Sequence, residues 1–171
     1  MPDPLADSDT PPLPQGRFAG PQAFAALIRQ ALGSAACQGW SQLILCDADF
    51  ADWPLGERAV VGALQQWARK GRQCTLLALD YTDLERRQPR FVQWRRQFDH
   101  LLTCRRALTT EASSLPSALW TPDWVLQRHD PHSNQGWTGS EPQRRLALAQ
   151  DLQEWLQHQS TPAFPASVLG L

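Results

Sequence analysis

The hydrophobic positions of the chain follow two periods, one typical of amphipathic helices and one typical of buried strands. Apolar residues recur at spacings of three or four after residues 20–21, over residues 56–70 and after Pro89, and they predict three helices. Short apolar runs at residues 43–46 and 74–79 predict two buried strands. A strand, a helix and a strand in this order favour a right-handed crossover between parallel strands. The pattern therefore predicts an α/β fold with a mixed, partly parallel sheet flanked by helices.

The second half of the chain predicts a third strand, a pair of extended arms and a loop. The strand is expected over residues 100–107. The two arms are expected on either side of Pro122 and Asp123, which are typical turn residues. Residues 129–141 are polar and contain glycine, so they predict a loop.

The last helix is expected to begin near Ser140, because Ser140 and Gln143 have the spacing of a capping box. Residues 161–171 form an apolar tail that is expected to dock on the body of the domain. The expected inward stripe of the helix is Leu146, Ala149, Leu152, Trp155 and Leu156.

The N-terminal residues 1–16 carry five prolines and little that can pack, so they predict a disordered or extended arm. This leaves residues 17–171 as a single domain, which is long enough to bury a full core. Eight tryptophans against one tyrosine is an unusual balance, and several of them are expected in the core or at an interface.

The bulk composition excludes some partners and favours a compartment. The formal net charge is −1, so no global field favours nucleic acid or an anionic membrane, and neither is expected as a partner. No apolar run approaches the roughly 20 residues of a membrane span, and no signal peptide is visible. The four cysteines form no metal or redox motif, so we expect a reduced, cytoplasmic, bacterial protein without cofactor or metal.

Acidic residues follow both predicted parallel strands. Asp47 and Asp49 follow the first strand, and Asp80 and Asp83 follow the second. Because parallel strands end at the same edge of a sheet, these four carboxylates are expected to lie together, where they could hold Mg²⁺. The competing interpretation is structural: Asp47 or Asp49 turns the chain at the strand exit, and Asp52 caps the next helix.

The letters "DAD" at residues 47–49 resemble the first motif of haloacid dehalogenase-type phosphatases, in which one Asp is the nucleophile and another the acid. That resemblance implies a phosphoester hydrolase using Asp47, Asp49 and Asp80 with Mg²⁺. The family also needs a lysine after a later strand, whereas the single lysine, Lys70, precedes the second strand. The chain has no phosphate-binding GxxxxGK[ST] loop, no GxGxxG and no GxSxG.

A basic segment follows the second strand. Interleaved aromatic residues are typical of surfaces on which nucleic-acid bases stack, but their helical spacing here places them on the buried face. Arg90, Arg95 and Arg96 are candidate anion-binding residues, Arg95 and Arg96 are expected to point away from the core, and Arg90 can pair with Asp80 or Asp83. The seven arginines, set against Glu85 and Asp99, are Arg86, Arg87, Arg90, Arg95, Arg96, Arg105 and Arg106.

A histidine pair lies in the polar segment near residue 130. His129 and His132 have HxxH spacing, and Asp130 and His100 are possible further metal ligands. Nothing in the pattern requires a rigid metal site, and a surface loop is the favoured interpretation.

The order of elements, with "LILCDADF", "WARKGR", "TLLALD" and a late hairpin, resembles one half of a phospholipase D-type domain. In that family the hairpin carries H-x-K-x(4)-D, where His is the nucleophile or acid and Lys binds phosphate. Placing the motif's Asp on Asp123 puts Pro116 and Ala118 at the His and Lys positions. The resemblance therefore implies a phospholipase D-like half-domain topology with its catalysis lost. It also implies a homodimer, because active members pair two halves.

The stretches "DFADWPL", "PRFVQWRRQFDHLLTCR" and "FPASVLGL" also resemble a proteobacterial domain without a settled activity, which is sometimes found beside acetyltransferase domains. That resemblance implies a possible acetyltransferase-linked context. Three functions stay open at this point: a non-catalytic module that binds or self-associates, a Mg²⁺-dependent phosphoester hydrolase, and an anion or nucleic-acid binder through the segment Arg86–Arg106.

Overall fold

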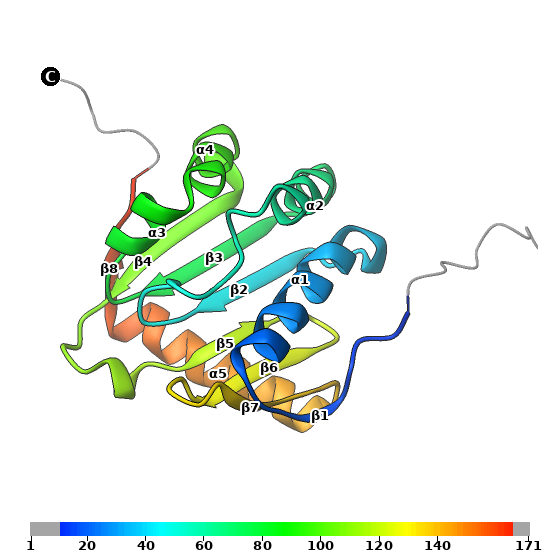
Figure 1. Ribbon diagram of the computed structural model, residues 1–171. Helices are drawn as coiled ribbons and strands as arrows, with labels where there is room; N and C mark the ends of the chain where they lie inside the picture. Colours follow the sequence, from blue (N-terminus) through cyan, green and yellow to red (C-terminus); the bar gives the residue numbers. More distant parts are fainter. Residues whose placement is uncertain (1–10, 166–171) are drawn as a thin grey trace, which may run out of the picture.

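A computed structural model describes residues 11–165, which form one eight-stranded mixed sheet with helices on both faces (Figure 1). The strand order is β1-β7-β6-β5-β2-β3-β4-β8. The strands are β1 (Gly16–Phe18), β2 (Gln42–Cys46), β3 (Gln73–Ala78), β4 (Leu102–Ala107), β5 (Ser117–Trp120), β6 (Val125–Asp130), β7 (Gln135–Gly139) and β8 (Ser160–Pro162). The helices are α1 (Pro21–Gln38), α2 (Arg58–Ala68), α3 (Thr82–Arg87), α4 (Pro89–Gln97) and α5 (Pro142–His158).

The centre of the sheet is parallel and its flanks are antiparallel. β2 pairs in parallel with β3, and β3 in parallel with β4. β5 turns back against β2, and β6, β7 and β1 continue antiparallel from it. The predicted fold class, a mixed and partly parallel sheet flanked by helices, is confirmed.

Two apolar clusters cover the two faces of the sheet. The larger one packs α1, α2, α3 and α4 on one face, and the smaller one packs α5 on the other (Figure 1). The expected burial of tryptophan is also confirmed, because six of the eight are buried. The buried tryptophans are Trp40, Trp53, Trp67, Trp94, Trp124 and Trp155.

The first helix shows how local sequence sets an element. Pro21 occupies the first turn of α1, where its missing N–H costs nothing, and Gly20 precedes it at φ 98°. Phe24, Ile28 and the apolar residues between and after them form the predicted inward stripe. Gly39 ends the helix in the left-handed conformation, which glycine adopts without strain.

The described part of the N-terminal arm is mostly exposed but makes specific contacts with the domain. Residues 1–10 lie outside the described residues; of residues 11–16, Leu13 and Gly16 are partly buried and the other four are exposed. The carbonyl oxygen of Pro14 accepts hydrogen bonds from Trp124 Nε1 and Thr138 Oγ1 at 2.9 and 2.8 Å. Gly16 begins β1, which pairs with β7.

The loop expected over residues 129–141 is wrong in part, because β6 extends to Asp130 and β7 occupies Gln135–Gly139. Its sequence, "QGWTG", contains two glycines and has little intrinsic strand propensity. Pairing on both sides, with β1 and β6, holds it extended. Gly136 is required by close packing, since a Cβ there would lie 2.1 Å from the carbonyl oxygen of Gln127.

The last helix differs from the prediction in its cap and its register. α5 is preceded by Glu141, and no side chain caps it, so the expected Ser140–Gln143 capping box does not form. Leu146 is 60% exposed instead of facing inward. The buried residues of α5 are Leu148, Leu152 and Trp155.

The segment that begins at Pro89 forms a helix, and the described part of the tail forms a strand. The predicted third helix, which begins after Pro89, is α4, and α3 precedes it. The described part of the tail docks as predicted: β8 pairs with β4, and the buried ring of Phe164 stacks on Tyr81 at 5.1 Å. Residues 166–171 lie outside the described residues.

Within residues 11–165, no helix has the length and apolarity needed to cross a membrane.

Candidate functional site

Strand pairing brings four polar residues together at the edge of the sheet where β2 and β3 end. Asp47 follows β2, and Cys46 at the end of β2 pairs with Ala118 in β5. Ser117, beside Ala118, pairs with Arg128 in β6, and Asn134 comes just before β7. We call Asp47, Ser117, Arg128 and Asn134 the polar centre; all four are buried.

Both oxygens of Asp47 are already engaged within the protein. Oδ1 accepts hydrogen bonds from Ser117 Oγ at 2.7 Å and from Arg128 Nη2 at 2.8 Å. Oδ2 accepts from the backbone N–H of Phe50 at 2.9 Å and, more weakly, from that of Asp49 at 3.3 Å. The predicted structural role is thus confirmed for Asp47, which turns the chain at the strand exit.

Arg128 organises the polar centre. Its Nε donates to Ser117 Oγ at 3.0 Å, and its Nη1 donates to Asn134 Oδ1 at 2.8 Å and to Asp52. Its guanidinium lies 4.0 Å above the ring of Phe24, in the geometry of a cation–π contact. Burial disfavours the charge, but hydrogen bonds and charges from Asp52 and Asp47 outweigh it, so the pKa of Arg128 is raised.

Asp52 does not have the capping role that the sequence predicts. It was expected to cap the helix after Pro54, but its carboxylate pairs with Arg128 instead. The residue before α2 is Glu57, which makes no side-chain cap and pairs with Arg29 at 2.7 Å on the surface. A charge partner from β6, which no local pattern indicates, therefore determines where Asp52 points.

The other predicted carboxylates lie near this edge but have separate partners. Asp49 Oδ1 accepts from the N–H of Ala51 at 2.9 Å, and burial, together with nearby carboxylates including Asp47, raises its pKa. Asp80 accepts hydrogen bonds from the hydroxyl and N–H of Thr82, which lower its pKa.

Asp83 is paired with Arg87 at 3.6 Å, so the expected partner Arg90 is not the one that the structure shows. Across residues 11–165, no three His, Cys, Asp or Glu side chains group so as to hold a metal ion. The predicted acidic edge is therefore a set of separate turns and ion pairs around a closed centre.

Arg128, Ser117 and Asn134 are not among the residues predicted from the sequence. One signal was present: in the extended arm "VLQRHD", Arg128 shares a face with Leu126, which is fully buried. A charged residue on the apolar face of a strand needs a buried partner of opposite charge. Ser117 and Asn134 carry no comparable local signal.

The candidate anion-binding arginines differ strongly in environment. Arg95 was expected to face solvent, but it is buried and donates to Asp99 Oδ1 at 2.6 Å and to the carbonyl oxygen of Phe164 at 3.1 Å. It therefore anchors the tail and is not available to a ligand. Arg96 is exposed.

Arg90 lies with Arg58 on a groove between α2 and α4, which has a volume of about 370 Å³. Neither arginine forms an ion pair with any residue between 11 and 165. Trp94 also lines the groove, and its buried Nε1 has no hydrogen-bond partner among the described residues. We call this the α2–α4 groove.

His129 lies in β6, near its end, and His132 lies in the turn between β6 and β7; both residues are exposed. Asp130 accepts hydrogen bonds from the N–H of His132 and from Ser133 Oγ, so it closes the turn. The favoured surface-loop interpretation therefore holds for His132, whereas His129 belongs to a strand.

Asp123, the residue aligned with the phospholipase D motif, lies at the opposite edge of the sheet from Asp47. β5 runs antiparallel to β2, from Ala118 beside Cys46 to Trp120 beside Ile44. The turn that follows Trp120 therefore lies toward the start of β2. Asp123 Oδ2 accepts a hydrogen bond from Trp40 Nε1 at 3.0 Å. Its role is thus to tie the turn to the start of β2.

The comparisons with known proteins concern the fold. No protein-family model and no curated protein matches the sequence. Among solved structures, the chain is similar to TrmBL2, an archaeal chromatin protein that shows a novel mode of DNA binding, with 13% identity and a TM-score of 0.62. That match covers 91% of this chain and 56% of TrmBL2.

A second similar structure is phosphatidylserine synthase from Haemophilus influenzae, with 11% identity and a TM-score of 0.49. It covers 81% of this chain and 37% of the synthase. The chain thus spans little more than half of one neighbour and about a third of the other. At these identities the likeness extends to the fold alone.

Proposed function

We propose that the protein is a non-catalytic, phospholipase D-like module that acts by binding, and that its polar centre stabilises the fold. One observation carries this proposal: both oxygens of Asp47 are occupied by donors from the protein, and its partner Arg128 is equally buried. A carboxylate in this state has no free lone pair for a metal ion or an attack on phosphorus.

The energetics of this buried pair also disfavour catalysis. To act as nucleophile or ligand, Asp47 would have to release Arg128, whose side chain is only 2% exposed. Removing one partner of a buried pair leaves an uncompensated charge and costs about 3–5 kcal/mol. A catalytic cycle that repeats this cost at each turnover is strongly disfavoured.

The test compares hydrolysis of 4-nitrophenyl phosphate and bis(4-nitrophenyl) phosphate, with Mg²⁺, by the wild type and by Asp47→Asn and Asp80→Asn. Asp80 is exposed, so its variant is expected to fold normally. We expect no hydrolysis that depends on either carboxylate. Hydrolysis by the wild type that is lost in a folded Asp47→Asn or Asp80→Asn variant overturns the proposal.

The binding proposal includes self-association, since the half-domain resemblance implies a paired partner. Among residues 11–165, no strand pairs with the outer side of β1, whereas β8 at the other edge of the sheet contains Pro162. Light scattering after size exclusion, over a concentration series, is expected to show a dimer. A monomer at the highest soluble concentration overturns self-association and leaves the argument about Asp47 unchanged.

The α2–α4 groove supports a second candidate function, the binding of an anion such as a nucleic-acid phosphate. Arg58 and Arg90 both lie in the first turn of their helices, where the helix dipole also favours negative charge. The similarity to a DNA-binding chromatin protein is consistent with this candidate.

The test of the groove is salt-dependent retention on an immobilised oligonucleotide. Arg58→Gln/Arg90→Gln is expected to lose retention, whereas Arg96→Gln, which removes an exposed charge from the same helix α4, is expected to keep it. Equal retention of all three proteins contradicts the assignment to the groove.

A further inference from the structure

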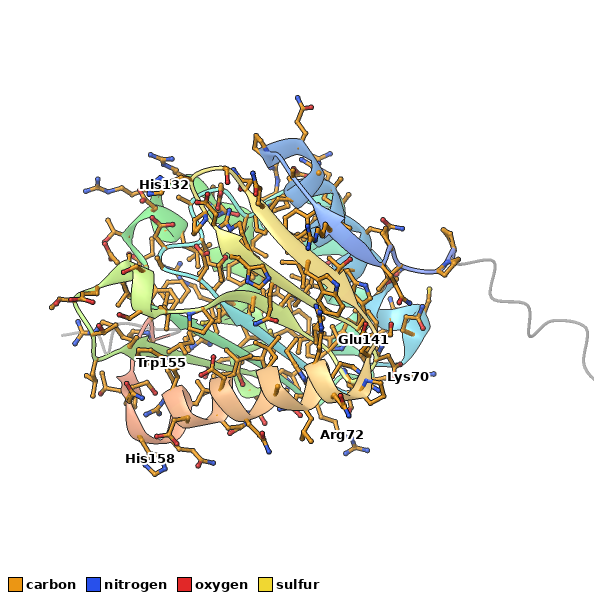
Figure 2. All side chains as sticks on the ribbon, turned by 90° about the horizontal axis from the view of Figure 1, so that it is seen from below. Lys70, Arg72, His132, Glu141, Trp155 and His158 are labelled. Atoms are coloured by element: carbon orange, nitrogen blue, oxygen red, sulfur yellow. The ribbon has the colours of Figure 1, made fainter. Side chains whose placement is uncertain are left out.

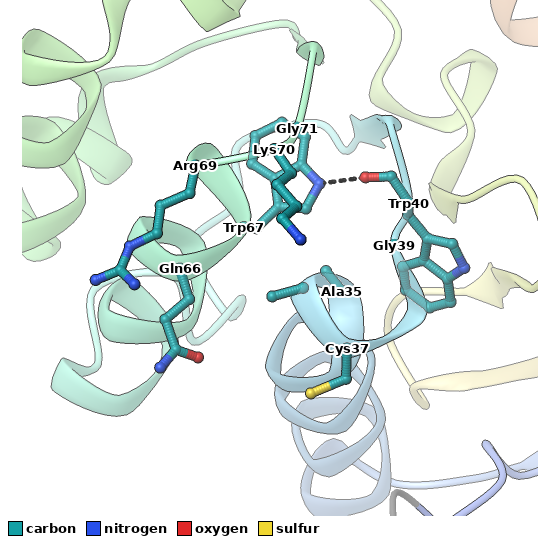
Figure 3. Close-up of a pocket in the computed structure, with 10 residues that line it drawn as sticks. Ala35, Cys37, Gly39, Trp40, Gln66, Trp67, Arg69, Lys70 and Gly71 are labelled. Atoms are coloured by element: carbon teal, nitrogen blue, oxygen red, sulfur yellow. Dashed lines mark hydrogen bonds between the residues drawn. The ribbon is translucent and has the colours of Figure 1, made fainter. Parts of the chain in front are cut away.

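A separate cavity of about 260 Å³ lies where the C-terminal turns of α1 and α2 meet (Figure 3). It is at the opposite edge of the sheet from the polar centre, because α1 and α2 lead into the starts of β2 and β3. Its walls combine small residues with two indoles. The lining residues used below are Ala36, Cys37, Trp40, Trp67, Arg69 and Lys70.

The cavity is held open by rigid contacts. Trp67 Nε1 donates to the carbonyl oxygen of Trp40 at 2.6 Å, which ties the end of α2 to the chain leaving α1 (Figure 3). Gly71 lies flat on the same indole, since a Cβ there would be 2.3 Å from the Trp67 ring. A pre-formed site of this kind needs little ordering when a ligand binds.

The charge at the cavity is positive. Lys70, the only lysine, and Arg69 line it, and neither forms an ion pair with any residue from 11 to 165. Figure 3 shows the amine of Lys70 directed across the cavity toward α1, while Arg69 extends outward. Two helix C-termini contribute about −0.5 charge each, so the two full positive charges prevail.

We infer that this cavity, the α1–α2 pocket, binds a small organic anion whose carboxylate pairs with Lys70 and whose apolar ring packs against the wall that contains Ala36 and Cys37. Apolar walls with a few placed polar groups are typical of ligand sites, and the volume suits a ligand smaller than most drugs. The pocket does not depend on the function proposed for the polar centre, and either can fail alone.

Cys37 supplies a direct reporter of occupancy. Of the four cysteines, Cys37 is exposed at the pocket, whereas Cys46, Cys74 and Cys104 are buried. Burial raises the pKa of Cys104 to about 11 and also raises the pKa values of Cys46 and Cys74, so these thiols react slowly. A thiol reagent applied to the folded protein therefore reports on Cys37.

The experiment uses three ligands of similar shape: 1-naphthylacetate, its neutral amide, and 1-naphthylmethylamine, which is a cation. Calorimetry gives affinity, and maleimide labelling gives protection of Cys37. We expect the anion to bind about tenfold more tightly than the amide and to slow labelling, because a charge-assisted hydrogen bond is lost in the amide. Weaker or absent binding is expected for the cation.

Two charge variants complete the test. Lys70→Gln is expected to bring the affinity for the anion down to that for the amide. Arg72→Gln removes a nearby exposed charge outside the lining, at the same corner of the molecule (Figure 2), and is expected to bind as the wild type does. Equal affinity for all three ligands, binding without protection of Cys37, or an equal loss in both variants overturns the inference.

Discussion

Arg128 donates from Nη2 to Asp47 Oδ1 over 2.8 Å, and the two side chains are only 2% and 4% exposed. They belong to segments 81 residues apart in the sequence. This ion pair joins the end of β2 to β6 at the edge where a ligand site is expected in an open parallel sheet. Because the pair occupies Asp47, this end of the sheet holds a closed polar centre instead of an open site.

The first prediction concerns this pair. Arg128→Ala and Asp47→Ala each leave a buried charge without its partner, so each is expected to lower the free energy of unfolding by about 3–5 kcal/mol. The double variant is expected to cost less than the sum of the two. Urea unfolding measures all three, and Arg29→Ala, which breaks the exposed pair with Glu57, is the control with an expected cost below about 1 kcal/mol.

A second prediction concerns pH and Asp49. Because burial raises the pKa of Asp49 in the folded protein, its charged form lowers stability above that pKa, and the penalty is absent below the unfolded value. Asp49→Asn should therefore be more stable than the wild type at pH 7, and the difference should shrink as pH falls through the raised pKa. Chemical unfolding at several pH values measures this difference.

For Asp80, the expected pH dependence of stability has the opposite sign. Hydrogen bonds from Thr82 lower its folded pKa, so its charge adds stability above the unfolded pKa, and this is lost as pH falls through the lowered value. Asp80→Asn should destabilise the protein at pH 7 and have no effect in strong acid. The same direction of change in the Asp49 and Asp80 variants would contradict both assignments.

The third prediction tests the docking of β1 and β7. Gly136→Ala places a methyl group against the carbonyl oxygen of Gln127 and the ring of Phe18, so we expect a loss of more than about 2 kcal/mol in stability. Gly33→Ala, in the exposed face of α1 with open space around it, should instead stabilise by about 0.5–1 kcal/mol. Thermal unfolding of both variants gives the comparison, and equal shifts would show that β7 does not pack against β6 and β1 as described.

The fourth prediction concerns the tail. Phe164→Ala removes a buried ring that stacks on Tyr81, and it is expected to cost about 3 kcal/mol, at the low end for such changes because the chain end can relax. Leu108→Ala, at a residue that is 64% exposed, should change stability by less than about 0.5 kcal/mol. A negligible effect of Phe164→Ala in urea unfolding would mean that the tail does not dock.

Local patterns correctly predicted the parallel centre of the fold. The apolar runs of β2 and β3, the stripe of α1 and the turn made by Asp47 all depend on residues within a few positions of one another. Such elements bury their own apolar side chains or satisfy their own backbone, so their signal is present in a short window of sequence.

The misassigned elements depend on distant partners. β1 and β7 have few apolar residues, and each becomes a strand because another strand pairs with it. Arg95 is basic and was expected at the surface, yet the carbonyl of Phe164 accepts a hydrogen bond from it in the interior, and Asp99, one helical turn away, is its charge partner. Local sequence could not indicate Phe164 or the pairing strands, because they lie far along the chain.

The polar centre shows the same division. The short-range pattern showed that acidic residues follow β2 and β3, at the end of the sheet where a ligand site is expected. Only the tertiary structure decided that Arg128, which lies in β6, pairs with Asp47 there and with Asp52 as well. The physical reason is the cost of burying a charge alone, which makes the two segments satisfy each other once the sheet has assembled.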